Sequence, residues 1–167
     1  MSAGSIIPGI NPTSVDTIPQ FKLGDIAGFD DLTDGYKEFM YGSAVTTFAA
    51  GTVAVEGIAV GAMSSISTTN TAGGQLGGHG SRVGVAQATL AIGQYGWFQV
   101  FGKTSALTAG AVALGTRLNT TATVGAVDDD GTVGSRAING MVFKTAPAGA
   151  AVSVDCRLGY PTVGVTL

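Results

Sequence analysis

The sequence predicts an all-β fold, a small β-sandwich or barrel whose short strands are separated by glycines. Short runs rich in β-branched and aromatic residues recur along the chain. In a strand, "WFQVFG" at 97–102 would place Trp97, Gln99 and Phe101 on one face and Phe98 and Val100 on the other. Ala-Gly precedes such a run three times, in "AAGTVAVEG", "TAGAVALGT" and "PAGAAVSVD". No long stretch keeps a helical period without Gly or Thr interrupting it.

Residues 1–20 are expected to form an extended N-terminal arm. They contain Pro8, Pro12 and Pro19 and a single charged residue, Asp16, and proline disfavours helix both at its own position and at the residue before it. A disordered terminus is the alternative to an arm laid along a neighbouring surface. If the segment is such an arm, its interface candidates are Ile6, Ile7, Ile10, Val15 and Ile18.

Residues 21–167 are expected to form one β-rich domain. Predicted strands follow one another in "GYKEFMYG" (35–42), "RVGVAQATLAIG" (82–93), "WFQVFG", "RAINGMVFKTA" (136–146) and "AAVSVDCRLGYP" (150–161). A Ser/Thr/Gly-rich segment at about 64–82 carries almost no charge and few apolar residues. We expect it to be a long exposed loop, since such a composition cannot bury a core.

Four of the aromatic residues lie in "GQYGWFQVFG" at 93–102. Alternation places Tyr95, Trp97 and Phe101 on one face of a strand and Phe98 on the other. We therefore predict Tyr95, Trp97 and Phe101 as core residues. Phe98 is the candidate for a contact between subunits, because aromatic side chains are enriched at interface centres.

Charged residues make up 11% of the chain, against roughly a quarter in ordinary soluble domains. A surface this poor in charge favours a protein that is largely buried in an assembly. The eight Lys and Arg residues are dispersed and the net charge is −3, which argues against direct nucleic-acid binding. The sequence also lacks the basic start of a signal peptide and any apolar run long enough to span a membrane.

Catalytic patterns are weak, and we expect neither an enzyme nor a cofactor or metal site. His79 is the single histidine and Cys156 the single cysteine, and nucleophilic catalysis would need both together with an orienting group. "GGQLGGHG" lacks the lysine of a phosphate-binding loop. The acidic clusters "DDLTDG" (30–35) and "DDDG" (128–131) match no calcium-loop pattern, so turns are favoured over cation binding.

The order of several segments resembles the small head-decoration (cement) proteins of tailed bacteriophages. After the arm come "FKLGD", "DGYKEFMYGSAVTTFAAGTVAV", "RVGVAQATLAIGQYGWFQVFG", "LNTTATVGAVDDD", "INGMVF" and "YPTVG", which together cover most of 21–163. The resemblance implies a β-rich module that binds the outer face of the phage head and bridges subunits of the major capsid protein. It further implies a homo-trimer on the virion surface, assembled in the bacterial cytoplasm.

Two other function classes stay open. A fibre- or adhesin-like β module would bind host glycans by stacking an exposed Trp or Tyr on a sugar, with "GQYGWFQVFG" at the surface. A hydrolase would use the acidic clusters, although no carboxylate pair stands out.

Overall fold

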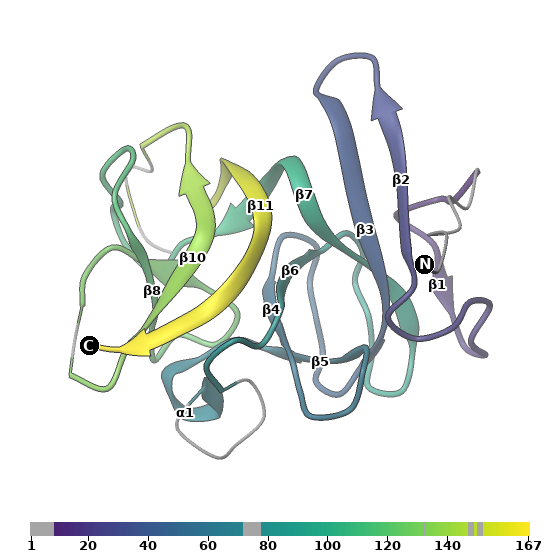
Figure 1. Cartoon of the computed structure of the whole chain (residues 1–167), viewed down its shortest axis with the longest axis horizontal. Helices are drawn as coiled ribbons and strands as arrows, with labels where there is room; N and C mark the ends of the chain where they lie inside the picture. Colours follow the sequence, from purple (N-terminus) through teal and green to yellow (C-terminus); the bar gives the residue numbers. More distant parts are fainter. Residues whose placement is uncertain (1–8, 72–77, 132, 147–148, 150–151) are drawn as a thin grey trace, which may run out of the picture.

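The computed structural model describes residues 9–71, 78–131, 133–146, 149 and 152–167 (Figure 1). Ile6 and Ile7 of the predicted arm lie outside the described residues, as do parts of the third Ala-Gly run at 147–155. Among the described residues the single helix, α1 (Thr68–Thr71), has four residues. The prediction of an all-β fold is confirmed.

In the described part of the chain, eleven strands join in one mixed sheet. In chain order they are β1 (Val15–Asp16), β2 (Ile26–Asp31), β3 (Gly35–Ala44), β4 (Val53–Glu56), β5 (Ala62–Ser65), β6 (Val83–Ala86), β7 (Tyr95–Leu107), β8 (Leu118–Thr120), β9 (Val127–Asp128), β10 (Arg136–Phe143) and β11 (Ser153–Thr166).

Five of these strands close into a small barrel. β3 pairs with β5 on one side and with β7 on the other, and β4 and β6 complete the ring between β5 and β7. Met40 of β3 lies opposite Phe98 of β7, and both belong to the core cluster inside the ring. That cluster consists of Met40, Ala44, Phe48, Ala54, Met63, Ala86, Leu90, Phe98 and Val100.

The C-terminal strands cover the outer face of β4 and β6. β7 runs on past the barrel and pairs with β11, which is followed across the sheet by β10, β8 and β9; Figure 1 shows these strands beside the barrel. The alternate residues of β4 and β6 that point out of the barrel, Val53, Val55, Val83 and Val85, pack in one buried cluster with residues of this second layer, among them Phe143.

The N-terminal segment covers the outer face of β3 and β7. Tyr41 and Trp97 lie opposite each other there, and neither is more than 1% exposed. Ile10, Phe21 and Leu23 pack against this third cluster, and the rings of Phe21 and Trp97 lie 5.1 Å apart between centroids. The short strand β1 pairs with the start of β7.

Phe98 corrects one prediction. Its side chain is 0% exposed and lies inside the barrel, so it cannot contact another subunit while the domain stays folded. Alternation correctly separates Trp97 from Phe98, but both faces of β7 are buried. Ring closure encloses one face, and the N-terminal segment covers the other.

The predicted loop at about 64–82 is also partly wrong. Ser64 and Ser65 end β5, and Ile66 is fully buried in the core between the barrel and the C-terminal strands. The backbone N–H of Ile66 donates to the carbonyl oxygen of Val53 and thus extends the pairing of β4. Because serine is small and can bond the backbone, a Ser-rich run can belong to a buried strand.

Candidate binding site

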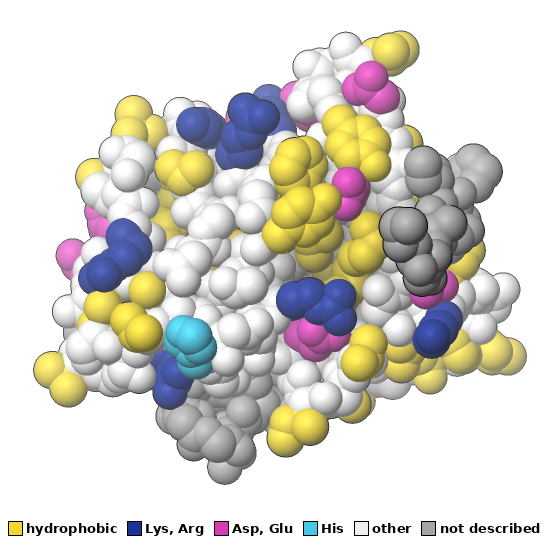
Figure 2. Space-filling model, viewed as in Figure 1, with side chains coloured by type: hydrophobic (Ala, Val, Ile, Leu, Met, Phe, Trp, Pro, Cys, Tyr) yellow, Lys and Arg dark blue, Asp and Glu magenta, His cyan; other side chains and the backbone are white. Residues whose placement is uncertain are grey.

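Three aromatic side chains from three strands meet at the surface. The ring of Phe101 in β7 lies 5.2 Å from that of Tyr160 in β11 and 6.3 Å from that of Tyr36 in β3, measured between centroids. Tyr36 is 45% exposed and Tyr160 is 54% exposed. We call these three residues the aromatic ridge. Figure 2 shows hydrophobic side chains gathered on the face where β3, β7 and β11 lie side by side.

A bulge in β7 places Phe101 between the other two strands. Glu38 of β3 lies opposite Phe101 and Phe39 lies opposite Gln99, so Val100 is an extra residue in β7. On its other side Phe101 lies opposite Gly159 of β11. Phe101 is therefore the residue at which β7 passes from one neighbouring strand to the next, a position that a bulge suits because it bends the strand.

Gly102 makes this passage possible. Its φ is +93°, and a Cβ at this position would lie 2.5 Å from the carbonyl oxygen of Tyr36. Only glycine satisfies both conditions, because other residues avoid this φ and carry the clashing atom.

A second irregularity, in β11, turns Tyr160 outward. Asn139 of β10 lies opposite Thr162 and Met141 lies opposite Leu158, so Gly140 alone faces three residues of β11. Tyr160 has φ 52° and is the only residue other than glycine with a positive φ among those described. A bulky side chain in this region is strained. At this strained position, the ring of Tyr160 points away from the sheet and packs on Phe101.

A carboxylate holds the ridge at one end. The hydroxyl of Tyr160 donates a hydrogen bond of 2.6 Å to Oε2 of Glu38. This bond, with burial and the charge of Glu38, raises the pKa of Tyr160 to about 12. Burial and the same charge raise the pKa of Tyr36. Both phenols lie beside the Glu38 carboxylate and, like an unperturbed tyrosine, are protonated at neutral pH.

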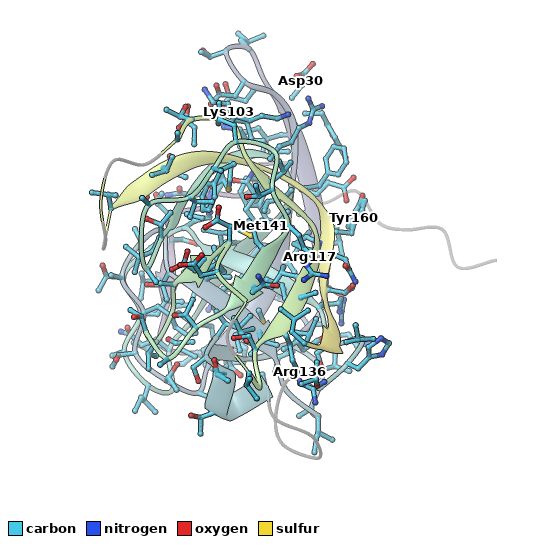
Figure 3. All side chains as sticks on the ribbon, turned by 90° about the vertical axis from the view of Figure 1, so that its left-hand side faces the viewer. Asp30, Lys103, Arg117, Arg136, Met141 and Tyr160 are labelled. Carbon is cyan, nitrogen blue, oxygen red and sulfur yellow. The ribbon has the colours of Figure 1, made fainter. Side chains whose placement is uncertain are left out.

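Three hollows adjoin the ridge. One, of about 400 Å³, is lined by Phe101, Arg157 and residues of β10 and β11; the other two flank the ridge beside Tyr160 and Tyr36. The hollow beside Tyr160, of about 330 Å³, is lined by Tyr160, Glu38 and Arg82 together with Ile26, Val83, Val100 and Pro161. The hollow beside Tyr36, of about 260 Å³, is lined by Tyr36 and Phe101 and by the cationic side chains of Lys103, Lys144 and Arg157, beside Asp34, Gly35 and Gly102. Figure 3 shows Tyr160 at the outer edge of the molecule beside β11, with Lys103 toward one end.

Lys144 and Arg157 differ from the other cations near the ridge. Neither side chain has a hydrogen-bond or ion-pair partner among the described residues, whereas Lys103 pairs with Asp34 and Asp155 and Arg82 pairs with Glu56. These two side chains can therefore donate to a ligand without breaking an existing contact.

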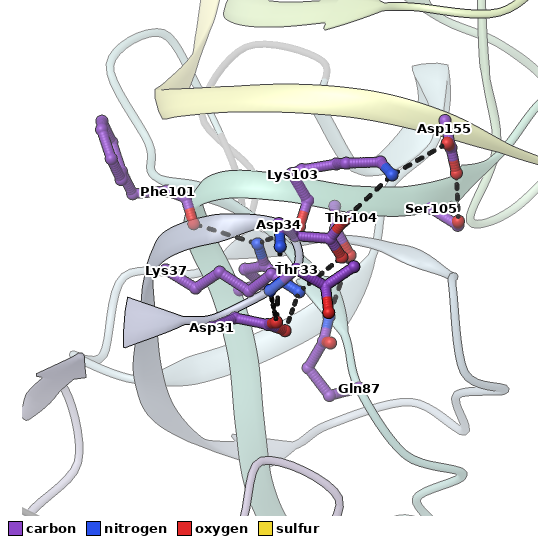
Figure 4. A network of polar contacts seen from close by, with 11 residues as sticks. Asp31, Thr33, Asp34, Lys37, Gln87, Phe101, Lys103, Thr104, Ser105 and Asp155 are labelled. Atoms are coloured by element: carbon purple, nitrogen blue, oxygen red, sulfur yellow. Dashed lines mark hydrogen bonds and ion pairs between the residues drawn. The ribbon is translucent and has the colours of Figure 1, made fainter. Parts of the chain in front are cut away.

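A network of ion pairs lies next to this site (Figure 4). Lys37 Nζ lies 2.8 Å from Asp31 Oδ2 and 3.0 Å from Asp34 Oδ2, and Lys103 Nζ lies 3.0 Å from Asp34 Oδ1 and 3.4 Å from Asp155 Oδ2. The hydrogen bond from Lys37 lowers the pKa of Asp31 to about 2. The network joins the β2–β3 hairpin to β7 and β11, and its carboxylates are already paired with cations.

The acidic clusters serve turns. Residues 30–35 form the end of the β2–β3 hairpin, and the carboxylates of Asp31 and Asp34 belong to the network above. In the second cluster, Asp129 Oδ2 accepts from the backbone N–H of Ala113 at 2.8 Å, and Asp128 Oδ1 accepts from the N–H of Asp129 at 2.8 Å. No group of three or more potential metal ligands occurs in the described part of the chain.

The arm candidates divide into buried and exposed residues. Ile10 packs on the cluster around Trp97, whereas Val15 and Ile18 are 41% and 68% exposed. Of the predicted core residues, Trp97 is buried, Tyr95 is partly buried against the same cluster, and Phe101 lies in none of the three clusters. The expectation that Phe101 belongs to the core is therefore corrected.

His79 and Cys156 do not form a catalytic pair in the structure. His79 is exposed, whereas Cys156 is 0% exposed inside the cluster beneath β10 and β11. Burial, with a smaller effect of Asp155, raises the pKa of the Cys156 thiol to about 12, so the thiolate that a nucleophile requires is disfavoured.

Sequence reasoning missed Tyr36, Glu38 and Tyr160 as site residues. The signal for Tyr160 was the tripeptide Gly-Tyr-Pro at 159–161, in which proline and glycine interrupt an otherwise regular strand and indicate a bulge. No local sequence pattern indicated that Tyr36 would belong to the same site as Tyr160.

No protein-family model matches the chain, and no curated protein matches it in sequence. Among the described residues, no helix is long and apolar enough to cross a membrane.

Proposed function

We propose that this chain is a structural capsid decoration protein. It binds the outer surface of a phage head, bridges major capsid protein subunits and stabilises the mature shell, as a homo-trimer on the virion surface after assembly in the host cytoplasm. The resemblance noted above is the source of this role, and the surface of the molecule supports it.

The observation that carries the proposal is the exposure of large aliphatic side chains on a surface with little charge. Leu32 is 102% exposed and Ile58 is 84% exposed, each in the short connection between two strands. Scattered exposed apolar residues are ordinary in soluble proteins, but here only 11% of residues are charged. Apolar loop tips around a rigid β core suit a protein that contacts several neighbours at once.

The mechanism is multivalent clamping. Each copy contacts more than one capsid subunit through contacts that are individually modest, and trimer formation multiplies them into firm attachment. A protein that binds only the expanded shell shifts the assembly toward that state and stabilises it. No catalytic group is needed for this role.

The N-terminal segment supplies one of these contacts. Ile10 and Asp16 attach it to the domain, and Ile18 projects from it into solvent. Removing residues 1–20 would expose the cluster around Trp97, so a point substitution is the sharper test. Ile18→Asp removes the apolar contact and adds a charge, and Thr17→Asp adds the same charge at an exposed neighbouring residue.

The test is a titration of purified protein onto expanded, DNA-free heads that lack it, with bound copies counted per shell. We expect saturation at a number set by icosahedral symmetry, with Ile18→Asp binding more weakly than Thr17→Asp. Absence of saturable binding by the wild-type protein would overturn the proposed function. Equal binding by the two variants would remove only the arm from the mechanism.

The alternative function, glycan binding, cannot use Trp97, because that side chain is 1% exposed and its ring is not accessible to a sugar. Any sugar site must therefore use other aromatic residues.

A further inference from the structure

We propose that the aromatic ridge (Tyr36, Phe101 and Tyr160) and its two flanking hollows bind a carbohydrate, a chain of neutral hexopyranose units. This site is separate from shell binding and does not depend on it.

The ridge offers the apolar half of such a site. Tyr36 and Tyr160 are about half exposed, and their rings adjoin Phe101 at 6.3 and 5.2 Å. A hexopyranose has an apolar face of C–H groups and an edge of hydroxyls. It can therefore lie on an aromatic ring while its hydroxyls reach the polar groups alongside, which is the arrangement of most small-ligand sites.

The hollows offer the polar half, with both signs of charge. Glu38 is an acceptor on one side of the ridge, and the unpaired Lys144 and Arg157 are donors on the other. A sugar hydroxyl both donates and accepts, so it can use all three groups. A phosphate oxygen only accepts, so it cannot use Glu38 as an acceptor, and the charge of that carboxylate would repel it. The mixture therefore favours a neutral sugar over a nucleotide.

The backbone indicates that the exposure of Tyr160 is not a by-product of packing. Its neighbours Leu158 and Pro161 are buried, so the strand regains its regular burial on both sides of the bulge. The chain nevertheless keeps a bulky residue at φ 52° and points its ring outward. Such strain is concentrated at functional sites, where it presents a side chain in a fixed position.

The surroundings favour a small ligand over a protein surface. A stable protein contact buries about 800 Å² on each partner and has an apolar centre. None of the exposed aliphatic side chains among the described residues lines either hollow. The ridge is instead a row of three rings between charged groups.

Tyr160→Gly is the decisive variant, because glycine accepts a positive φ without strain. We expect it to stay folded with a similar thermal stability, because relief of the strained φ offsets the lost hydrogen bond to Glu38, while it loses sugar affinity. Calorimetric titrations would use maltohexaose, cellohexaose, mannohexaose and galactohexaose as probes. With the best of these, Tyr160→Gly should bind about tenfold more weakly, the size expected for loss of one stacked ring. Tyr160→Phe keeps the ring and should retain most of the affinity.

A second pair of variants tests the polar half. Arg157→Gln should weaken sugar binding, whereas Arg117→Gln, which removes an exposed arginine that lines neither hollow, should not.

Three results would overturn the inference. The first is that none of the four hexasaccharides binds the wild-type protein. The second is that oligothymidylate binds the ridge more tightly than any sugar does. The third is that no sugar binds and Tyr160→Gly lowers the number of copies on the shell, which would make the ridge a protein contact. The first result leaves the proposed shell binding intact, because the shell titration measures it separately.

Discussion

The hydroxyl of Tyr41 donates a hydrogen bond of 2.6 Å to Oδ2 of Asp16 and thereby attaches the N-terminal segment to the outer wall of the barrel. The same hydroxyl accepts from the backbone N–H of Gln20 at 3.1 Å. Both contacts lie beside Trp97. From Ile10 onward, the segment is therefore part of the domain and not a free tail.

Tyr41 makes stability depend on pH in the alkaline range. Burial, followed by the hydrogen bond to Asp16, raises its pKa to about 12, while an unfolded tyrosine loses its proton near pH ~10. The unfolded chain therefore ionises first, and the stabilisation present below pH ~10 is lost as the pH rises toward 12. Urea unfolding between these pH values should show this fall.

The control for this prediction is Tyr41→Phe, which should reduce the pH dependence. What remains belongs in part to Tyr160, whose pKa is also raised to about 12. An unchanged pH dependence in Tyr41→Phe would contradict the assignment.

Arg82 and Glu56 form a bidentate ion pair that should matter for stability. Arg82 Nε and Nη2 lie 2.6 and 2.8 Å from the two carboxylate oxygens of Glu56, which is 8% exposed. Arg82→Ala leaves the carboxylate with the backbone N–H of Gly61 as its remaining hydrogen-bond donor among the described residues. We expect a loss of about 2 kcal/mol in the free energy of unfolding, less than for a fully buried pair because the arginine side chain is partly exposed.

Denaturant unfolding would measure this loss, with Arg117→Ala as the matched surface substitution, expected to cost less than about 0.5 kcal/mol. Equal effects of the two variants would show that the pair adds nothing beyond an ordinary surface arginine.

Phe98 should behave as a core residue. Phe98→Ala leaves a cavity inside the barrel and should lower the free energy of unfolding by about 3–5 kcal/mol. Phe101→Ala should cost less, because that ring is partly exposed. Unfolding followed by Trp97 fluorescence, which should be blue-shifted and resistant to quenching in the native state, would measure both. A stable Phe98→Ala variant with poor shell binding would restore Phe98 as an interface residue.

Cys156 should be chemically silent in the folded protein. Its side chain is 0% exposed and its pKa is raised to about 12, so a disulfide reagent such as DTNB should label it only on unfolding. The labelling rate should rise with urea in step with the unfolded fraction. Rapid labelling without denaturant would show that β10 and β11 open in the native state.

Local patterns were enough to predict the fold class. The alternation in 97–102 and the glycines around it predict a strand and its two faces correctly, because side-chain alternation and positive φ are properties of a few neighbouring residues. They do not predict what covers each face. For Phe98 that depends on the pairing of β3 with β7, which closes the barrel.

The sequence by itself determined that this protein is built of β-strands and carries little charge. Tertiary structure decided which aromatic residues are core and which are surface, since Glu38 and Tyr160 meet although they are 122 positions apart. Their meeting requires β7 to pair with β3 and with β11 at Phe101, and a bulge to turn Tyr160 outward. Such contacts depend on strand order and register, which long-range pairing sets and no local run of residues encodes.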